Sequence, residues 1–441
     1  MSFKAIFFGI FMLALSVPVA ASCSRVTSSS SLTSDLISQG YSAASWTGAC
    51  DTCSGNVGLP TVISINTGSN FQPAGTLLAS ATGSFITAAT NTAYSANQIL
   101  FRCALEDASS LYEMYATNGD STYAGKYLVS DIDGAYYDVA KNVAVRMTNL
   151  STGEYYSRYW KQRQLTSDDW VEDSSYIYIP ASAFSNVLYE MYKTDDTSYY
   201  VSSANRYVDT WTQPRGYIAF KGPGLTTNSL TAGMDSNSYY YGWYSQWPGA
   251  WSTYGNVTYV RGALCQVADY PSVVLLPTIS NSELSNGNTS QAPFNVSLEC
   301  ESGANSSVST STTSSANVAI GFLVNQSNAV TAATNLGLTS TNGLTYLLDS
   351  NYGSSGVASG VGIKIYDQNG SAMNLLSSKT MGTGNNGGWY SYADIMTNAG
   401  ESSSGLTTYT GTFVASLEAI SGETINSGTV NAQLQVIVSF Q

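Results

Sequence analysis

The last stretch of the chain, residues 428–441, reads Gly-Thr-Val-Asn-Ala-Gln-Leu-Gln-Val-Ile-Val-Ser-Phe-Gln. Apolar residues occupy every second position, and polar residues occupy most of the positions between them. Because successive side chains of a β-strand point to opposite faces, this alternation predicts a half-buried strand. An apolar edge strand left bare is an aggregation hazard, so we expect a segment from outside the chain to cover it. The apolar face consists of Val430, Ala432, Leu434, Val436, Val438 and Phe440.

Two motifs lie upstream of this stretch. Residues 358–370 read Ala-Ser-Gly-Val-Gly-Ile-Lys-Ile-Tyr-Asp-Gln-Asn-Gly, a strand pattern that runs into a turn, and Cys265 precedes Cys300, which ends the run Pro-Phe-Asn-Val-Ser-Leu-Glu-Cys. Together with the final stretch, these motifs resemble the pilins and two-domain tip adhesins of chaperone–usher fimbriae. Chains of that family close with a glycine, an alternating strand and a penultimate aromatic residue, here Gly428 and Phe440. The resemblance covers the chain from Cys265 onward.

The resemblance implies a fold and a set of partners for residues 263–441. It implies an incomplete immunoglobulin-like pilin domain that lacks its last strand, with a disulfide between Cys265 and Cys300. A periplasmic chaperone is expected to supply a strand, with basic residues that hold the carboxylate of Gln441, until the N-terminal arm of the next pilin replaces it by β-augmentation. An outer-membrane usher is the further partner. The residues expected to contact the donor strand or the chaperone are Val430, Leu434, Val436, Val438, Phe440 and Gln441.

The first residues, 1–21, read as a secretory signal peptide, because Lys4 precedes an apolar run that ends in Val-Ala-Ala. The mature chain is therefore expected to begin at Ser22. A lipoprotein acylated at Cys23 is the alternative. Because Cys23 follows the expected start at once, no alternating arm precedes it. We therefore expect a tip subunit that accepts a strand but does not donate one.

The composition favours strands and turns over helices. Only 10% of the 441 residues are charged, and the chain holds 32 tyrosines and 39 glycines. No long stretch shows a helical period, whereas residues 61–65, 98–103 and 142–147 read as strands. We predict an all-β chain of two β-sandwich domains, in which residues 22–262 form a sandwich of the jelly-roll or immunoglobulin-like type. The net charge of −13 argues against nucleic acid as a partner.

Six cysteines in an exported chain indicate disulfides rather than free thiols. Cys23, Cys50, Cys53 and Cys103 allow three pairings among themselves. We favour Cys23–Cys50 with Cys53–Cys103, because a Cys50–Cys53 bridge would close a short, strained loop. The alternative for residues 50–53 is a redox or metal motif. The chain has no histidine, so a zinc site with imidazole ligands is excluded, and we expect no metal.

The same absence of histidine removes Ser-His-Asp and Cys-His catalysis. Pairs of carboxylates, such as residues 168–169 and 195–196, remain as candidates for a glycosidase acid and nucleophile. Adjacent carboxylates in turn-like sequence are more often solvated loop residues. We therefore expect no enzymatic activity and no cofactor.

Residues 111–115 and residues 188–192 both read Leu-Tyr-Glu-Met-Tyr. We interpret the two copies as equivalent strands in the two sheets of a duplicated sandwich, and ligand loops are the alternative. In the strand interpretation, Glu113 and Glu190 face solvent.

The aromatic segment, residues 239–254, is the densest unusual feature of the chain. It reads Tyr-Tyr-Tyr-Gly-Trp-Tyr-Ser-Gln-Trp-Pro-Gly-Ala-Trp-Ser-Thr-Tyr, and its Pro-Gly pair indicates a loop. Such loops suit sugars, whose CH-rich faces lie on aromatic rings, although a place in the core is the equal alternative. If the strand at residues 256–264 spans the domain, this loop lies at the end farthest from the fibre. The predicted ligand contacts are Tyr241, Trp243, Gln246, Trp247 and Trp251.

These observations predict a fimbrial tip adhesin. Residues 22–262 would be a lectin-like domain that binds a host-surface receptor, most simply a glycan, and residues 263–441 would anchor it to the fimbria on the bacterial surface. A structural or capping pilus subunit without receptor binding is the alternative. The identity of the glycan is not contained in the sequence.

Overall fold

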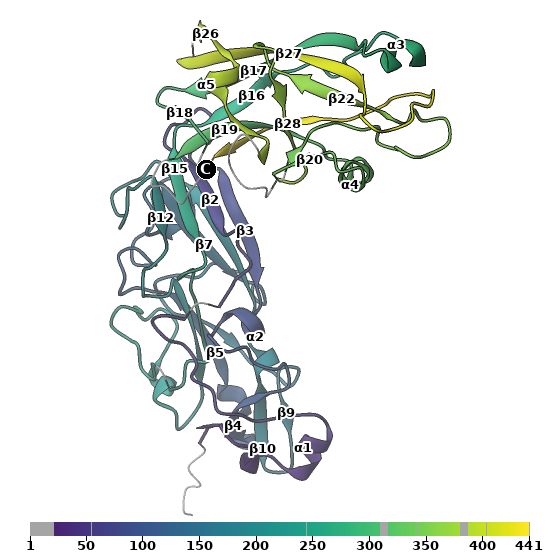
Figure 1. Cartoon of the computed structure of the whole chain (residues 1–441). Helices are drawn as coiled ribbons and strands as arrows, with labels where there is room; N and C mark the ends of the chain where they lie inside the picture. The colour runs from purple at the N-terminus through teal and green to yellow at the C-terminus, as the bar shows by residue number, and fades with distance from the viewer. Residues whose placement is uncertain are drawn as a thin grey trace, which may run out of the picture.

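The computed structural model describes residues 22–441 except 54, 244, 309–315, 342, 380–386, 403 and 441. The predicted signal peptide lies outside the described residues. Figure 1 shows an elongated molecule in which strands β16 to β28 gather at one end and the earlier strands form the longer body. The described chain is nearly all β, which confirms the predicted fold class.

Four small sheets form the N-terminal body. Their orders are β1-β4-β10-β9, β3-β11-β7-β6, β12-β15-β2 and β14-β13-β5-β8. The three strands predicted from sequence are confirmed as β2, β4 and β7. The strands are β1 (Ser24–Arg25), β2 (Val62–Asn66), β3 (Leu77–Gly83), β4 (Ile99–Ala104), β5 (Tyr112–Thr117), β6 (Tyr136–Tyr137), β7 (Val143–Asn149), β8 (Lys161–Gln164), β9 (Val171–Glu172), β10 (Tyr176–Pro180), β11 (Val187–Lys193), β12 (Arg206–Val208), β13 (Gly216–Lys221), β14 (Gly249–Trp251) and β15 (Thr258–Gly262).

Two sheets form the C-terminal part and enclose its apolar core. One runs β16-β17-β27-β22-β23, with β26 also beside β27, and the other runs β18-β19-β24-β21-β20, with β25 and β28 also beside β19. Their strands are β16 (Cys265–Asp269), β17 (Ser290–Glu301), β18 (Asn305–Ser306), β19 (Asn317–Leu323), β20 (Thr339–Ser340), β21 (Gly343–Leu344), β22 (Val361–Tyr366), β23 (Ala372–Met373), β24 (Leu375–Leu376), β25 (Trp389–Ser391), β26 (Thr397–Glu401), β27 (Leu406–Ala419) and β28 (Gln435–Phe440).

The helices are short, as the missing helical period predicts. None of those in the described residues has the length and apolar run needed to span a bilayer. They are η1 (Ser29–Ser31), α1 (Ser34–Ser38), α2 (Phe85–Ala88), η2 (Leu105–Ser110), η3 (Ala181–Ala183), η4 (Thr226–Ser229), α3 (Asn281–Ser285), α4 (Ser327–Asn335) and α5 (Tyr392–Ile395).

The repeated Leu-Tyr-Glu-Met-Tyr segments form β5 and β11, which belong to different sheets. The strand interpretation is therefore confirmed, but the predicted exposure of their glutamates is wrong. Glu113 is fully buried and accepts a hydrogen bond from Arg163 Nε at 2.7 Å, and the side chain of Glu190 is 12% exposed and bonds Arg146 Nε at 3.0 Å. Both strands are central in their sheets, so a neighbouring strand supplies each carboxylate with a cation.

Three disulfides cross-link the described chain: Cys23–Cys103, Cys50–Cys53 and Cys265–Cys300. The last confirms the pairing implied by the resemblance, whereas the favoured pairing of the first four cysteines is wrong. β1 runs antiparallel to β4 with Ser24 opposite Arg102, so residues 23 and 103 face each other one position further on. Cys50 and Cys53 close a turn in which Cys53 N–H donates to the carbonyl of Cys50. A short loop of this kind is therefore compatible with a bridge.

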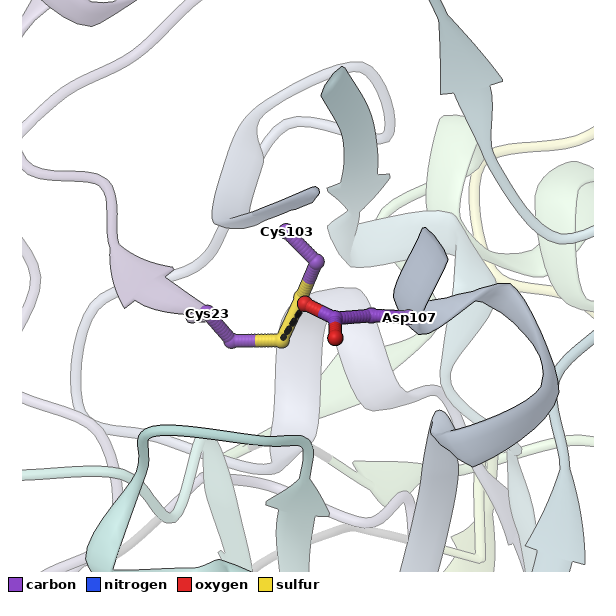
Figure 2. Close-up of side chains that lie close together, drawn as sticks. All are labelled: Cys23, Cys103 and Asp107. Carbon is purple, nitrogen blue, oxygen red and sulfur yellow. Dashed lines mark hydrogen bonds between the residues drawn. A yellow bond between two sulfur atoms is a disulfide. The ribbon is translucent and has the colours of Figure 1, made fainter. Parts of the chain in front are cut away.

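A buried carboxylate lies beside the first disulfide (Figure 2). Asp107 Oδ2 is 3.9 Å from Cys23 Sγ and accepts a hydrogen bond from the backbone N–H of Ala104 at 3.3 Å. Burial raises the pKa of this carboxyl. Within the described residues, these two cysteines and Asp107 form a group of side chains whose types could together hold a metal ion. Both sulfurs, however, are bonded to each other in the disulfide.

The two parts meet at residues 262–265. Asn66 at the end of β2 donates to Glu301 Oε1 at 2.9 Å, and Leu264 N–H donates to Glu301 Oε2 at 3.1 Å. Glu301 is buried although it is charged. A Cβ placed on Gly262 would lie 2.8 Å from the ring of Phe440. The last strand of the chain therefore reaches the junction between the parts.

Candidate functional site

The end of the chain forms strand β28, which pairs antiparallel with β19 from Val318 to Leu323. The predicted strand covered residues 428–441, but only Gln435–Phe440 pairs as a strand. Residues 428–434 run beside residues 349–358 through isolated contacts, such as Ala358 N–H to the carbonyl of Thr429 at 3.0 Å. A continuous strand did not form there because no regular strand lies next to it.

The alternation predicted for this end of the chain is confirmed for residues 430–435, whereas residues 436–440 are all half-buried. Val430, Leu434, Val436, Val438 and Phe440 are half-buried against the C-terminal core, whereas the polar positions 431, 433 and 435 are exposed. In the described residues, β28 pairs with β19 along one edge and with no strand along the other. Gln441 lies outside the described residues. β28 therefore presents an apolar row with an open hydrogen-bonding edge.

Residues 270–279 present a second apolar row to the same core. Val274, Leu276 and Ile279 are half-buried, whereas Val273 and Leu275 are 68% and 82% exposed. This segment alternates like a strand but follows β16 without strand pairing of its own. β16 is in contact with β28. The two half-buried rows give the arrangement that an added strand requires: apolar positions for alternate side chains and a free backbone edge.

The aromatic segment is split between core and surface. Trp247 is 1% exposed, and its ring lies 4.8–5.1 Å from those of Trp160, Trp243 and Tyr217. Trp251 is 0% exposed and donates from Nε1 to Tyr156 Oη at 2.9 Å. The core alternative therefore holds for Trp247 and Trp251, and the ligand contacts predicted for these two rings are not supported. The two rings belong to different apolar clusters, which the alternate residues of β13 separate: Trp251 shares one with Ile218 and Phe220, and Trp247 shares the other with Tyr217 and Ala219.

The other predicted contacts lie nearer the surface. Tyr241 is 39% exposed and its neighbour Tyr240 is 60% exposed. The side chain of Gln246 is half-buried, and its Oε1 accepts a hydrogen bond from Thr227 N–H at 3.0 Å. Trp243 is half-buried and packs edge-on against Trp247. A sugar contact at Tyr241, Trp243 and Gln246 remains a prediction.

The argument that placed the aromatic segment at the far end of the molecule fails. The strand expected over residues 256–264 is only Thr258–Gly262, and a five-residue strand cannot span the body. Figure 1 shows that β4, β9, β10 and α1 form the end farthest from β16 to β28. The distal position of the aromatic segment stays a prediction.

A shallow hollow of about 650 Å³ lies between two loops, with Ser130, Asp131, Asp195 and Asp196 in its lining. Asp196 accepts from Ser130 N–H at 3.1 Å and from Ser130 Oγ at 2.9 Å. Asp131 accepts from Thr194 Oγ1 at 2.7 Å. A hydrogen bond from Tyr137 is the main reason that the pKa of Asp196 is lowered. These carboxylates join the two loops to each other.

A second charged group is enclosed in the N-terminal core. Arg215 lies 2.8 Å from Asp138 and 2.7 Å from Asp209, and all three side chains are at most 1% exposed. Tyr259 donates to Asp138 at 2.6 Å. Burial lowers the pKa of Arg215, but the two carboxylates outweigh this effect and raise it well above its usual value. The group is closed to solvent, so its role is structural.

One family model is similar to the C-terminal part of the chain. Residues 251–441 match the model described as fimbrial protein. Because of this similarity, residues 263–441 are called the fimbrial domain below. The match includes Cys265, Cys300 and β28, the features on which the resemblance rests. No curated protein sequence matches the chain.

Solved structures of fimbrial subunits are distantly similar. The CupB6 tip adhesin of Pseudomonas aeruginosa is 13% identical, with 89% of this chain and 96% of that chain covered and a TM-score of 0.26. The CsuC–CsuE chaperone–tip adhesion subunit pre-assembly complex of Acinetobacter baumannii is 13% identical, with 86% and 97% covered and a TM-score of 0.23. The P pilus rod subunit PapA is 14% identical, with 41% and 94% covered and a TM-score of 0.23. TM-scores this low support no conclusion about function.

Proposed function

We propose that this protein is the adhesin at the tip of a chaperone–usher fimbria. Residues 22–262 bind a receptor on a host surface, and residues 263–441 attach the subunit to the fibre. The observation that carries the proposal is the open edge of β28 in a chain whose C-terminal part matches the fimbrial family. The separate apolar cores of the two parts support the division, because none of the described residues before Cys265 belongs to the C-terminal core.

The missing strand defines the partners. A donor strand laid along β28 would bond its free backbone edge and place alternate apolar side chains between the rows of β28 and residues 270–279. In this proposal a periplasmic chaperone supplies the strand first, an outer-membrane usher receives the complex, and the arm of the next subunit then replaces the chaperone. The protein would thus travel through the periplasm to the tip of the fimbria.

The tip position is supported at the other end of the chain. Cys23 is bonded to Cys103, and β1 follows immediately in the sheet with β4. If cleavage occurs before Ser22, no free segment remains that could serve as a donor strand. Such a subunit ends the fibre, and its N-terminal part is then the portion that meets a surface.

The receptor is most simply a glycan. Tyr239, Tyr240 and Tyr241 are 36%, 60% and 39% exposed and follow one another on the same loop. Exposed aromatic rings with neighbouring polar groups suit the mixed apolar and polar faces of sugars. A capping subunit without receptor binding would not require them.

The attachment is tested with a synthetic donor peptide of alternating apolar residues. We expect the full-length chain to aggregate or to melt at low temperature alone, and the peptide to raise its Tm. A control peptide with the apolar residues replaced by aspartate should have no effect. A full-length chain that is monomeric and stable without a donor would contradict the attachment mechanism. Adhesion of the peptide-complemented chain to host cells tests the receptor function, and a chain that binds no cell surface would support the capping role.

A further inference from the structure

A half-buried arginine on the first strand has no acidic partner. The guanidinium of Arg25 lies over the indole of Trp46, with Cζ 3.7 Å from the ring centroid. No carboxylate of the described residues forms an ion pair with it, and Nε is shielded from solvent without an acceptor. The two terminal nitrogens also have no protein acceptor in the described chain, but they are not shielded in this way.

This state differs from that of three other enclosed arginines. Arg215 and Arg163 each bond two carboxylates, and Arg261 donates to three oxygen atoms. Arg25 has none of these, although the chain carries 29 acidic residues against 16 basic ones. A desolvated N–H group without an acceptor is costly, which applies to Nε of Arg25, and burial lowers the pKa of this side chain. The stacking on Trp46 is the contact that holds the guanidinium in place, and its two terminal nitrogens stay open to an acceptor from outside.

The surroundings of Arg25 are fixed. Trp46 donates from Nε1 to the carbonyl of Val26 at 2.8 Å and packs edge-on against Phe101. Asp107, the acidic residue beside Cys23, accepts from Ala104 and forms no ion pair with Arg25. The indole therefore covers one side of the guanidinium, and no neighbouring acid competes for its N–H groups.

The strand that carries Arg25 lies at the edge of its sheet and near one end of the molecule. β1 is the edge strand of the sheet β1-β4-β10-β9. β4, β9 and β10 form the end of the body farthest from the fimbrial domain (Figure 1). In a tip subunit this end is the one that meets another surface.

We propose that Arg25 binds the oxyanion of an acidic saccharide, that is, a sugar carrying a carboxylate or a sulfate group. This site rests on the proposed receptor function, and it adds that the saccharide recognised by the receptor site is negatively charged. A guanidinium presents paired N–H groups that match the two oxygens of a carboxylate or sulfate, and such charge-assisted bonds are stronger than neutral ones. The ligand would accept hydrogen bonds from the two terminal nitrogens of Arg25, because Nε is shielded from solvent.

The experiment compares three probes of the same sugar with the full-length chain complemented by donor peptide: lactose, 3′-sialyllactose and lactose 3′-sulfate. We expect at least one acidic probe to bind about tenfold or more tightly than lactose in a calorimetric titration, because charge-assisted bonds to the guanidinium are lost with the neutral sugar. The acidic probe that binds identifies carboxylate or sulfate as the ligand group. Equal affinity for all three, or binding of none, overturns the proposal.

Substitutions then assign the effect to Arg25. Arg25→Gln should reduce the affinity for the acidic probe about tenfold or more and leave that for lactose unchanged, and Arg25→Lys should retain only part of it. Arg206→Gln removes the same charge from another half-buried position, on β12, and should change neither the affinity for the acidic probe nor that for lactose. The Tm of Arg25→Gln is measured alongside to show that this variant folds. If it does not fold, the affinity of Arg25→Lys for the acidic probe decides whether Arg25 is the site. Undiminished affinity of a folded Arg25 variant refutes the site.

The proposed receptor function has a separate readout. If cells treated with sialidase and sulfatase are still bound as well as untreated cells, the adhesin function stands and the acidic-sugar site is wrong. If untreated cells are not bound at all, the receptor function itself fails.

Discussion

Replacing Trp247 with alanine should destabilise the N-terminal part strongly. The ring is 1% exposed and packs against three other aromatic rings at 4.8–5.1 Å. Its Nε1 donates to the carbonyl of Tyr241 at 2.8 Å, and this acceptor would lose its partner. Truncation of a buried tryptophan to alanine costs about 3–5 kcal/mol, and the aromatic contacts favour the upper half of that range.

The expected loss is large enough for a melting experiment. For a unit of roughly 240 residues, 1 kcal/mol corresponds to roughly 2–4 °C, so the Tm of the N-terminal transition should fall by roughly 6–20 °C. Differential scanning calorimetry of the full-length chain with donor peptide resolves this transition from that of the fimbrial domain. Tyr240→Ala, on the same loop but 60% exposed, is the matched control and should change stability by less than about 0.5 kcal/mol.

One result would refute the reasoning. If Trp247→Ala melted within about 2 °C of the parent and lost receptor binding, the ring would have to be accessible to ligand in solution. If both variants lost binding and only Trp247→Ala lost stability, the loop would carry the site through its exposed tyrosines.

Three further predictions concern one disulfide and two groups of paired charges. Replacing Cys265 and Cys300 with serine should cost about 3–4 kcal/mol in the chain-entropy model and lower only the fimbrial-domain transition in calorimetry; a fall in both transitions would contradict this. Arg215→Met leaves two buried carboxylates unpaired and should cost about 3–5 kcal/mol in urea unfolding, with partial recovery when both carboxylates are also changed to amides; without recovery the ion group is not the cause. Arg158 donates to both carboxylate oxygens of Asp235, at 2.9 and 2.6 Å, and lowers the pKa of this residue in the folded state, so the carboxylate stabilises the fold above its unfolded-state pKa. The stability difference between the parent and Asp235→Asn, about 0.5–1 kcal/mol at neutral pH, should therefore shrink as pH falls from the unfolded-state pKa through the lower folded-state pKa. A difference that grew in acid would contradict this assignment.

The sequence predicts the C-terminal part well because its signals are local. The alternation that ends at Phe440 needs only the strand period, and residues 430–435 show the expected exchange of half-buried and exposed positions. The turn after β22 was readable for the same reason. Asp367 Oδ1 accepts from the N–H groups of Asn369 and Ser371, and Gly370 has φ +76°, a conformation that favours glycine.

The sequence fails where a feature depends on contacts between distant segments. Cys23 pairs with Cys103 because of the register of β1 on β4, across a separation of 80 residues. Trp247 is buried because β13 and residues near Trp160 close over it, which an irregular segment does not reveal. The unpaired state of Arg25 was likewise missed, since it depends on which acids lie nearby. The composition gave no signal for it, because 29 acidic residues against 16 basic ones predict a partner for each arginine.

The junction at Gly262 has a mechanical consequence. A pull on the fimbrial domain reaches the N-terminal body along β15, which pairs in parallel with β2 and antiparallel with β12. Force along the strand axis loads both ladders in shear, so their hydrogen bonds must break together rather than one after another. The bond from Asn66, at the end of β2, to Glu301 lets β2 carry part of the load directly. The connection between the parts is therefore built to resist traction.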